Sequence, residues 1–159
     1  MRTALESSTS SHAVSFDSAR FLAAQESTYV QALAEIRAGQ KRTHWMWFIF
    51  PQLRGLGRSE MAERYALSGA DAARQYLAHP VLGARLRECV EALTGQQGRT
   101  ASQIFGFPDD LKLHSSLTLF AVADSSPGNP FERALEQYFA GRKDEATLTL
   151  LGKARAHAR

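Results

Sequence analysis

An unbroken apolar run, Trp45 to Phe50, constrains the fold more than any other part of the chain. It holds both tryptophans, and it shows neither the alternation of a half-exposed strand nor the one-sided stripe of a surface helix. Pro51 ends it, because proline disfavours helical geometry in the residue before it, and Gly55 and Gly57 then favour a turn. We therefore expect this segment to be buried on nearly all sides, at the centre of the core.

Polar residues flank this apolar run on both sides. Lys41, Arg42 and His44 precede it and Gln52 follows it. If the run is helical, His44 stacks on Phe48 at the edge of an aromatic cluster. An apolar wall with a few convergent polar groups is typical of small-molecule sites. The same residues would also suit a plain core with solvated flanks, so both interpretations stay open.

The composition predicts one soluble domain. The chain has 159 residues, of which 44% are hydrophobic and 22% charged, as is usual for a globular protein long enough to bury a core. Residues 1–15 are rich in Ser and Thr and lack the apolar stretch of a secretory signal, so we expect a disordered leader. The longest apolar run has six residues, too few to span a membrane. A lone cysteine, Cys89, fits a reducing cytoplasm, and we expect it to be an inert buried thiol.

The positive net charge comes from the C-terminal end. Lys153, Arg155 and Arg159 lie in the last seven residues, so residues 1–152 carry 16 cations and 16 anions. A neutral body argues against nucleic-acid binding, and we expect residues 153–159 to form a basic disordered tail. His and Cys residues lack metal-ligand spacing, so we expect neither a metal site nor a cofactor. A monomer is expected.

Hydrophobic periodicity and capping signals predict an all-α fold, a compact multihelical single domain of about seven or eight helices over residues 16–152. The run 111–122 is ambiguous, because its leucines would also suit a strand, but its length and the preceding aspartates favour a helix. Eight helices are expected: 18–38; a short helix capped by Ser59; one capped by Ser68 and ending at Leu77; one from Pro80 to about Leu93; a short one capped by Thr100; 111–122; one from Pro130; and one capped by Asp144. If the aromatic segment is also helical, Thr43 is its N-cap.

A second group of chemically capable residues lies at the start of the 111–122 run. It places a cation, an imidazole and two hydroxyls near a helix N-terminus, where backbone N–H groups favour an anion. These residues are Lys112, His114, Ser115 and Ser116. Asp109 or Asp110 could orient a Ser/His pair, although capping explains the aspartates equally well and small serines could simply let helices approach.

We therefore consider two hypotheses of function. The first is binding, with possible hydrolysis of a phosphate or N-glycosidic bond, of an anionic or nucleotide-like molecule between the 44–52 aromatic segment and the 112–116 helix start. In it, His44 and His114 would carry protons, and the ligand-binding residues would be Lys41, Trp45, Trp47, Gln52, Lys112, Ser115 and Ser116. The alternative is a non-catalytic protein–protein interaction module that uses an exposed apolar patch.

Several motifs resemble the bacterial domain-of-unknown-function family 1810. They are His44-Trp45-Met46-Trp47-Phe48-Ile49-Phe50-Pro51-Gln52-Leu53 with Gly55-Leu56-Gly57, Tyr76-Leu77-x-His79-Pro80-x-Leu82-Gly83, Ile104-Phe105-Gly106, and Lys112-Leu113-x-Ser115-Ser116-Leu117-Thr118-Leu119-Phe120. The resemblance covers roughly residues 21–151. It implies a compact, mainly helical cytoplasmic protein without an established activity, in a family sometimes labelled calpastatin, and it implies helices for both ambiguous runs. A looser likeness in size and helical content is to NADAR-type ADP-ribosyl glycosidases, whose catalytic motif this chain lacks.

Overall fold

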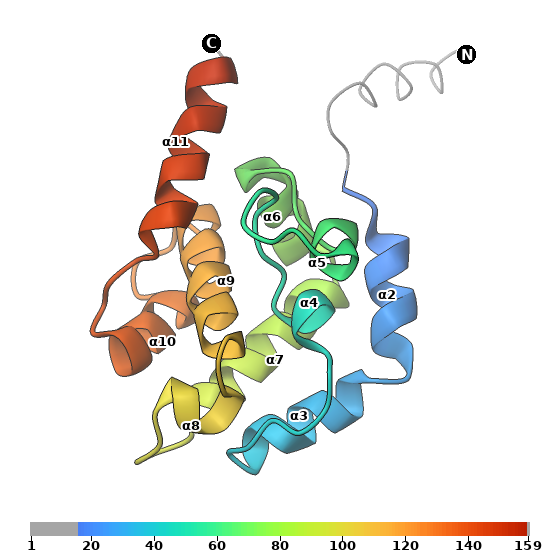
Figure 1. Ribbon diagram of the computed structural model, residues 1–159, viewed down its shortest axis with the longest axis vertical. Coiled ribbons are helices and arrows are strands. Elements are labelled where there is room, and N and C mark those ends of the chain that lie inside the picture. Colours follow the sequence, from blue (N-terminus) through green and yellow to red (C-terminus); the bar gives the residue numbers. More distant parts are fainter. Residues whose placement is uncertain (1–15, 159) are drawn as a thin grey trace.

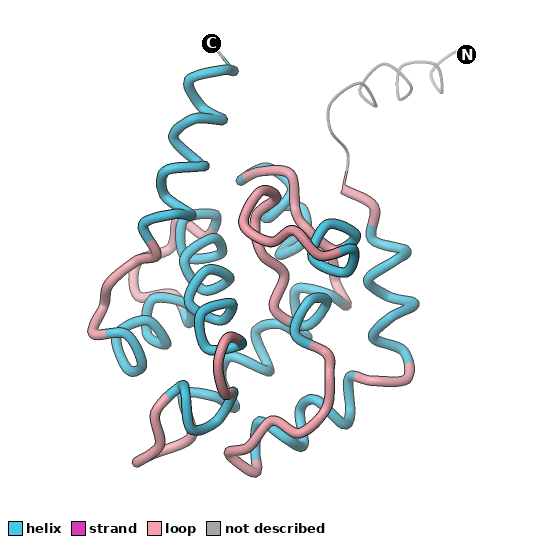
Figure 2. The backbone as a smooth tube through the Cα atoms, in the orientation of Figure 1, coloured by secondary structure: helices cyan, strands magenta, loops and turns pink. Residues whose placement is uncertain are grey.

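The computed structural model describes residues 16–158, with side chains described to residue 152. All the regular elements in this part of the chain are helices (Figure 2). One isolated parallel bridge joins Leu53 to Leu67. The all-α prediction is therefore confirmed. The leader expected over residues 1–15 lies outside the described residues.

The helices of the described residues are more numerous than the sequence predicts because residues 18–38 form two helices instead of one. Three of the others have only four or five residues. They are α2 (Ser18–Glu26), α3 (Tyr29–Arg37), α4 (Met46–Ile49), α5 (Glu60–Arg64), α6 (Ala70–Ala78), α7 (Leu82–Thr94), α8 (Ala101–Phe105), α9 (Asp109–Ala123), α10 (Pro130–Phe139) and α11 (Glu145–Ala158). The last helix runs past residue 152, where the sequence analysis ends the domain. Alanine, lysine and arginine, which dominate residues 153–158, are strong helix formers.

Helix α9 is the central element (Figure 1). It packs against α4, α6, α8, α10 and α11, and every residue from Ser115 to Ala121 is buried. A helix that is apolar on nearly all sides must be surrounded by other elements. This enclosure explains why the sequence of α9 lacks a one-sided helical stripe and could also be interpreted as a strand.

The aromatic run is buried, as predicted, except at one residue. Trp45 and Phe50 are fully enclosed, and both lie within about 6 Å of the Phe105 ring, with centroid distances of 6.2 and 5.9 Å. Trp47 is only half-buried. Only one helical turn, α4, forms in this segment, and it ends before Pro51 as expected.

Helix boundaries account for most of the errors in the sequence prediction. Residues 18–38 form two helices instead of one: Ser27 is the C-cap of the first, and Thr28 is the N-cap of the second, without a side-chain cap hydrogen bond. Thr43 does not cap α4, since its hydroxyl donates to Glu35 instead. Ser68 does not cap α6, whose N-cap is Gly69.

Other caps follow the sequence more closely. Thr100 forms the predicted capping box of α8, and Asp144 accepts the Thr147 amide at the start of α11. Pro130 occupies the first turn of α10, as expected. Pro80 lies two residues before α7, and there the Nδ1 atom of His79 accepts the amides of residues 81 and 82.

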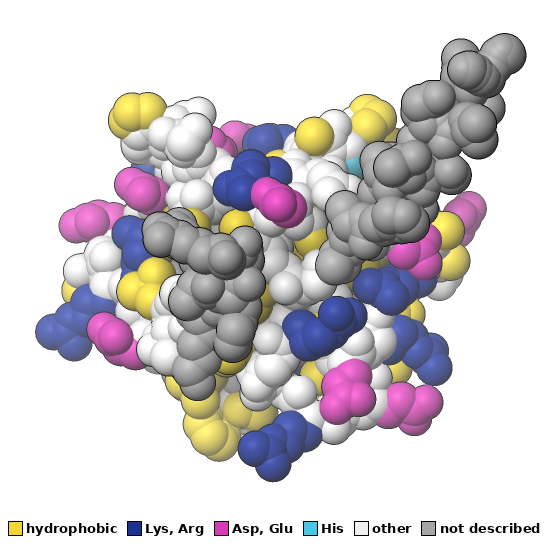
Figure 3. Space-filling view, turned by 90° about the horizontal axis from the view of Figure 1, so that it is seen from above, with side chains coloured by type: hydrophobic (Ala, Val, Ile, Leu, Met, Phe, Trp, Pro, Cys, Tyr) yellow, Lys and Arg dark blue, Asp and Glu magenta, His cyan; other side chains and the backbone are white. Residues whose placement is uncertain are grey.

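The described surface carries both signs of charge. On the face seen in Figure 3, Lys and Arg side chains are interspersed with Asp and Glu, so this face presents no field of a single sign. Between residues 16 and 158, none of the helices combines the length and the apolar character that crossing a membrane would require.

Candidate functional site

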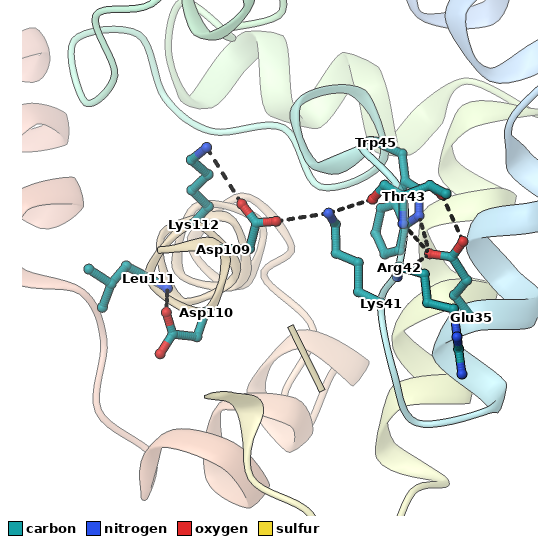
Figure 4. Close-up of polar contacts among 9 residues, drawn as sticks. All are labelled: Glu35, Lys41, Arg42, Thr43, Trp45, Asp109, Asp110, Leu111 and Lys112. Atoms are coloured by element: carbon teal, nitrogen blue, oxygen red, sulfur yellow. Dashed lines mark hydrogen bonds and ion pairs between the residues drawn. The ribbon is translucent and has the colours of Figure 1, made fainter. Parts of the chain in front are cut away.

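A buried carboxylate, Glu35 of α3, organises the loop that leads into the aromatic run (Figure 4). Its Oε1 atom accepts the backbone amides of Arg42 at 2.8 Å and Thr43 at 3.1 Å and the Trp45 indole N–H at 2.8 Å. Its Oε2 atom accepts the Thr43 hydroxyl at 2.7 Å and the Gln31 amide at 2.8 Å. Five donors therefore hold one side chain that is 4% exposed.

These hydrogen bonds keep Glu35 ionised. Burial by itself raises the pKa of the carboxyl group, but the donors from Arg42, Gln31, Thr43 and Trp45 outweigh it and lower the pKa to about 2. A carboxylate that accepts several N–H groups is stabilised in its charged form. The result is a rigid loop in which the position of Trp45 depends on a charge.

A second carboxylate, Asp109, joins two lysines that are far apart in sequence (Figure 4). Lys41 Nζ lies 2.8 Å from Asp109 Oδ2 and donates to the Thr43 carbonyl at 2.6 Å. Lys112 Nζ lies 3.6 Å from Asp109 Oδ1. Asp109 begins α9, where the helix dipole favours a negative charge. The sequence suggested Asp109 or Asp110 as caps, but the N-cap position is Pro108 and both aspartates lie in the first turn.

Each of these lysines also stands over a tryptophan ring. Lys41 Nζ is 5.0 Å from the centroid of Trp45, and Lys112 Nζ is 5.3 Å from that of Trp47. Such cation–π contacts add attraction where water is partly excluded. The Nε1 atom of Trp47 is buried and has no hydrogen-bond partner. We call Lys41, Trp45, Trp47, Asp109 and Lys112 the lysine–tryptophan cluster.

The two histidines lie in different surroundings. His44 is exposed, in the loop between Thr43 and Trp45. His114 stacks flat on Phe139, with ring centroids 4.1 Å apart, and its Nε2 atom lies 2.8 Å from the Arg142 carbonyl oxygen. A carbonyl only accepts, so Nε2 must carry the proton. His114 therefore serves the packing of α9 against α10 and does not join the cluster.

The remaining candidates also lie apart from the cluster. Ser115 donates to the Leu111 carbonyl and to Asp144 Oδ2, both at 3.2 Å, and thereby ties α9 to the start of α11. Ser116 is fully buried and its hydroxyl has no partner. Gln52 is half-buried, and its backbone carbonyl accepts the Leu67 amide at 2.9 Å. Four of the nine predicted site residues thus converge, namely Lys41, Trp45, Trp47 and Lys112.

Comparison with known proteins identifies the family. The family described as "Protein of unknown function (DUF1810)" matches residues 15–151. The chain belongs to the DUF1810 family. It is similar to the crystal structure of the conserved hypothetical protein Rv1873 from Mycobacterium tuberculosis, with 50% identity, a TM-score of 0.84, and coverage of 86% of this chain and 97% of that one. No curated protein matches it.

This DUF1810 chain contains one central residue that the sequence analysis missed. Glu35 was not singled out, although it shares an i, i+3, i+4 stripe with Ala32 and Ile36, which are both fully buried. A carboxylate on the apolar stripe of a helix must find donors, because an unpaired buried charge is too costly. That spacing was the signal that could have identified it.

Proposed function

We propose that this DUF1810 protein binds a small anionic, nucleotide-like molecule at the lysine–tryptophan cluster. The observation that carries the proposal is that two lysines share one carboxylate, each of them standing over an indole ring. The cluster therefore has one positive charge in excess beside an aromatic face. A phosphate would pair with the surplus charge, and a base would stack on the ring.

The two lysines differ in their freedom to meet a ligand. The Lys41 side chain is 7% exposed and makes the shorter ion pair with Asp109. The Lys112 side chain is 27% exposed and makes the longer one. Lys112 is therefore the ligand contact, and Lys41 holds Asp109 in place. Trp47 is half-buried beneath Lys112, and its indole N–H is buried without a partner; a base would stack on this ring once Lys112 turns from it toward the phosphate.

The geometry supports binding and gives no support for a particular reaction. His114 and Ser115, two of the residues considered for catalysis, are engaged by Arg142 and Asp144 at the other side of α9. His44, exposed and directly after Thr43, whose carbonyl Lys41 contacts, is the histidine we retain as a candidate proton carrier. Cytoplasmic localisation and a monomeric state stay predictions.

Calorimetric and thermal-shift titration with AMP and ADP-ribose tests the proposal. The wild-type protein should be stabilised by each saturating ligand, by about 2.7 kcal/mol when the ligand is at 100 times its Kd. Lys112→Gln should weaken binding by about tenfold or more, since it removes a charge-assisted contact.

The matched control is Lys143→Gln, which removes a lysine whose Nζ lies 4.0 Å from Glu132, away from the cluster. It should leave the affinity within about twofold of wild type. Absence of any ligand-dependent shift in the wild type, or equal losses in the two variants, would reject the proposed site.

A further inference from the structure

Two arginine side chains line a small cavity in another part of the molecule. A cavity of about 30 Å³ lies between α2, the turn after the aromatic run and the start of α6. Its lining includes Phe16 and Arg20 from the α2 side, Arg54, and Ser68 and Ala72 at the start of α6. None of these residues belongs to the lysine–tryptophan cluster.

The two arginines of this cavity have no carboxylate partner among the described residues. The six ion pairs found there involve other cations. The Nε atom of Arg20 is buried and makes no hydrogen bond, and its guanidinium lies over the Phe21 ring at 5.4 Å. A buried N–H of a charged group without an acceptor is costly, and Arg20 is one of the residues that line the cavity.

Backbone pairing places Arg54 beside the segment that leads into α6. The Arg54 amide donates to the Leu67 carbonyl at 2.7 Å, and the Leu67 amide donates to the Gln52 carbonyl at 2.9 Å. This parallel bridge between Leu53 and Leu67 places Arg54 next to Ser68. The paired backbone therefore fixes where the Arg54 and Ser68 side chains begin, and the Arg54 side chain itself is exposed.

Helix α6 begins beside the same cavity, whose lining includes Ala72 of its first turn. Helix α6 has nine residues, and its N-cap, Gly69, offers no side-chain acceptor. The first N–H groups of a helix have no intrahelical partner and favour anions. The one acidic residue in this first turn, Asp71, is paired with Arg74, and its side chain is 85% exposed.

We infer that this cavity binds a tetrahedral oxyanion, either inorganic phosphate or the phosphoryl group of a small monoester. Arg20 and Arg54 supply planar forks of N–H donors that match phosphate oxygens, and Ser68 adds a hydroxyl donor. A site of about 30 Å³ holds roughly two water-sized volumes, which suits a phosphoryl group whose remaining substituent projects into solvent. We call it the arginine cavity.

Titration calorimetry with inorganic phosphate, against chloride at equal ionic strength, tests this site. Arg54→Gln should weaken phosphate binding by about tenfold or more, because it removes a charge-assisted hydrogen bond. Arg58→Gln removes the same charge from an exposed residue outside the cavity, and should change the affinity by less than about twofold. Phosphate binding no stronger than chloride binding, or equal effects of the two variants, would overturn the inference.

Three additional measurements complete the test. Ser68→Ala, a small change on the cavity wall, should also weaken phosphate binding, so the test does not depend on Arg20, whose replacement could disturb folding. Lys112→Gln should leave phosphate affinity unchanged, which separates this site from the proposed nucleotide site; loss of phosphate binding in that variant would contradict the inference. Phenyl phosphate distinguishes a phosphate monoester from inorganic phosphate as the ligand of the cavity. Phenyl phosphate that binds more tightly than inorganic phosphate assigns a monoester, and phenyl phosphate that binds more weakly assigns the free anion.

Discussion

Replacing Glu35 by glutamine removes the negative charge that organises residues 41–45 while preserving the size of the side chain. Glutamine keeps one carbonyl oxygen and replaces the other carboxylate oxygen by an amide NH2 group. The oxygen can accept the donors of only one of the two carboxylate positions, so the NH2 group faces either Gln31 and Thr43 or the three donors on Oε1. Unsatisfied buried donors cost about 1–3 kcal/mol each. We expect the free energy of unfolding at pH 7 to fall by about 3 kcal/mol.

The same hydrogen bonds lower the pKa of Glu35 and so make this stabilisation depend on pH. The pKa of Glu35 is lowered from 4.5 to about 2 in the folded protein, so its stabilisation is complete above pH 4.5 and is lost as the pH falls toward 2. A shift of this size corresponds to about 3 kcal/mol at pH 7 and to roughly 1 kcal/mol at pH 3. The gap in stability between wild type and Glu35→Gln should therefore narrow as the pH is lowered.

Urea denaturation at pH 7 and pH 3, followed by circular dichroism, measures this gap. Glu63→Gln is the control, because it makes the same change at an exposed residue of α5 and should alter the free energy of unfolding by less than about 0.5 kcal/mol. The reasoning is refuted if Glu35→Gln matches this control, or if its effect is as large at pH 3 as at pH 7.

Three further predictions concern packing, the second carboxylate and the thiol. Gly83→Ala should lower the free energy of unfolding by about 2 kcal/mol or more in thermal unfolding, because the alanine Cβ would lie 2.1 Å from the Leu77 carbonyl oxygen. Gly95→Ala is the control: the nearest atom to its Cβ would be at 3.4 Å, and the change should lower the free energy of unfolding by less than about 1 kcal/mol. Asp109→Asn should lower the free energy of unfolding in urea by about 1–3 kcal/mol, since a nearly buried lysine loses its counter-charge; a change below about 0.3 kcal/mol would contradict this. Burial raises the pKa of the Cys89 thiol to about 12, so mass spectrometry should find no alkylation of the native protein at pH 8 and rapid alkylation in urea.

The helical architecture could be predicted because its signals are local. Caps such as Thr100 and Asp144 and the proline at position 130 each act within one turn, and all three are where the sequence placed them. The bend at Ser27 and Thr28 was missed because the apolar stripe continues on both sides of it. A short polar pair weakens a helix without interrupting its periodicity.

The candidate site could be predicted only in part because its contacts are long-range. Lys41 and Lys112 were each chosen for their local setting, but nothing in the sequence shows that both would reach Asp109. The sequence favours His114 as much as Lys112, yet residues two positions apart on a helix point to different faces, and the partner of His114 is Phe139 of α10. Tertiary packing decides which side of α9 faces the aromatic run.

The central claim, that an anionic ligand binds over Trp47, is tested most directly by the two indole N–H resonances in a nitrogen–proton correlation spectrum. Trp47→Phe assigns them, since it leaves only the signal of Trp45. Titration with AMP should shift the Trp47 signal in a saturable way and leave that of Trp45, which is fully buried and bonded to Glu35, nearly unchanged. If neither signal moves at millimolar ligand, or if only that of Trp45 does, the lysine–tryptophan cluster is not the binding site.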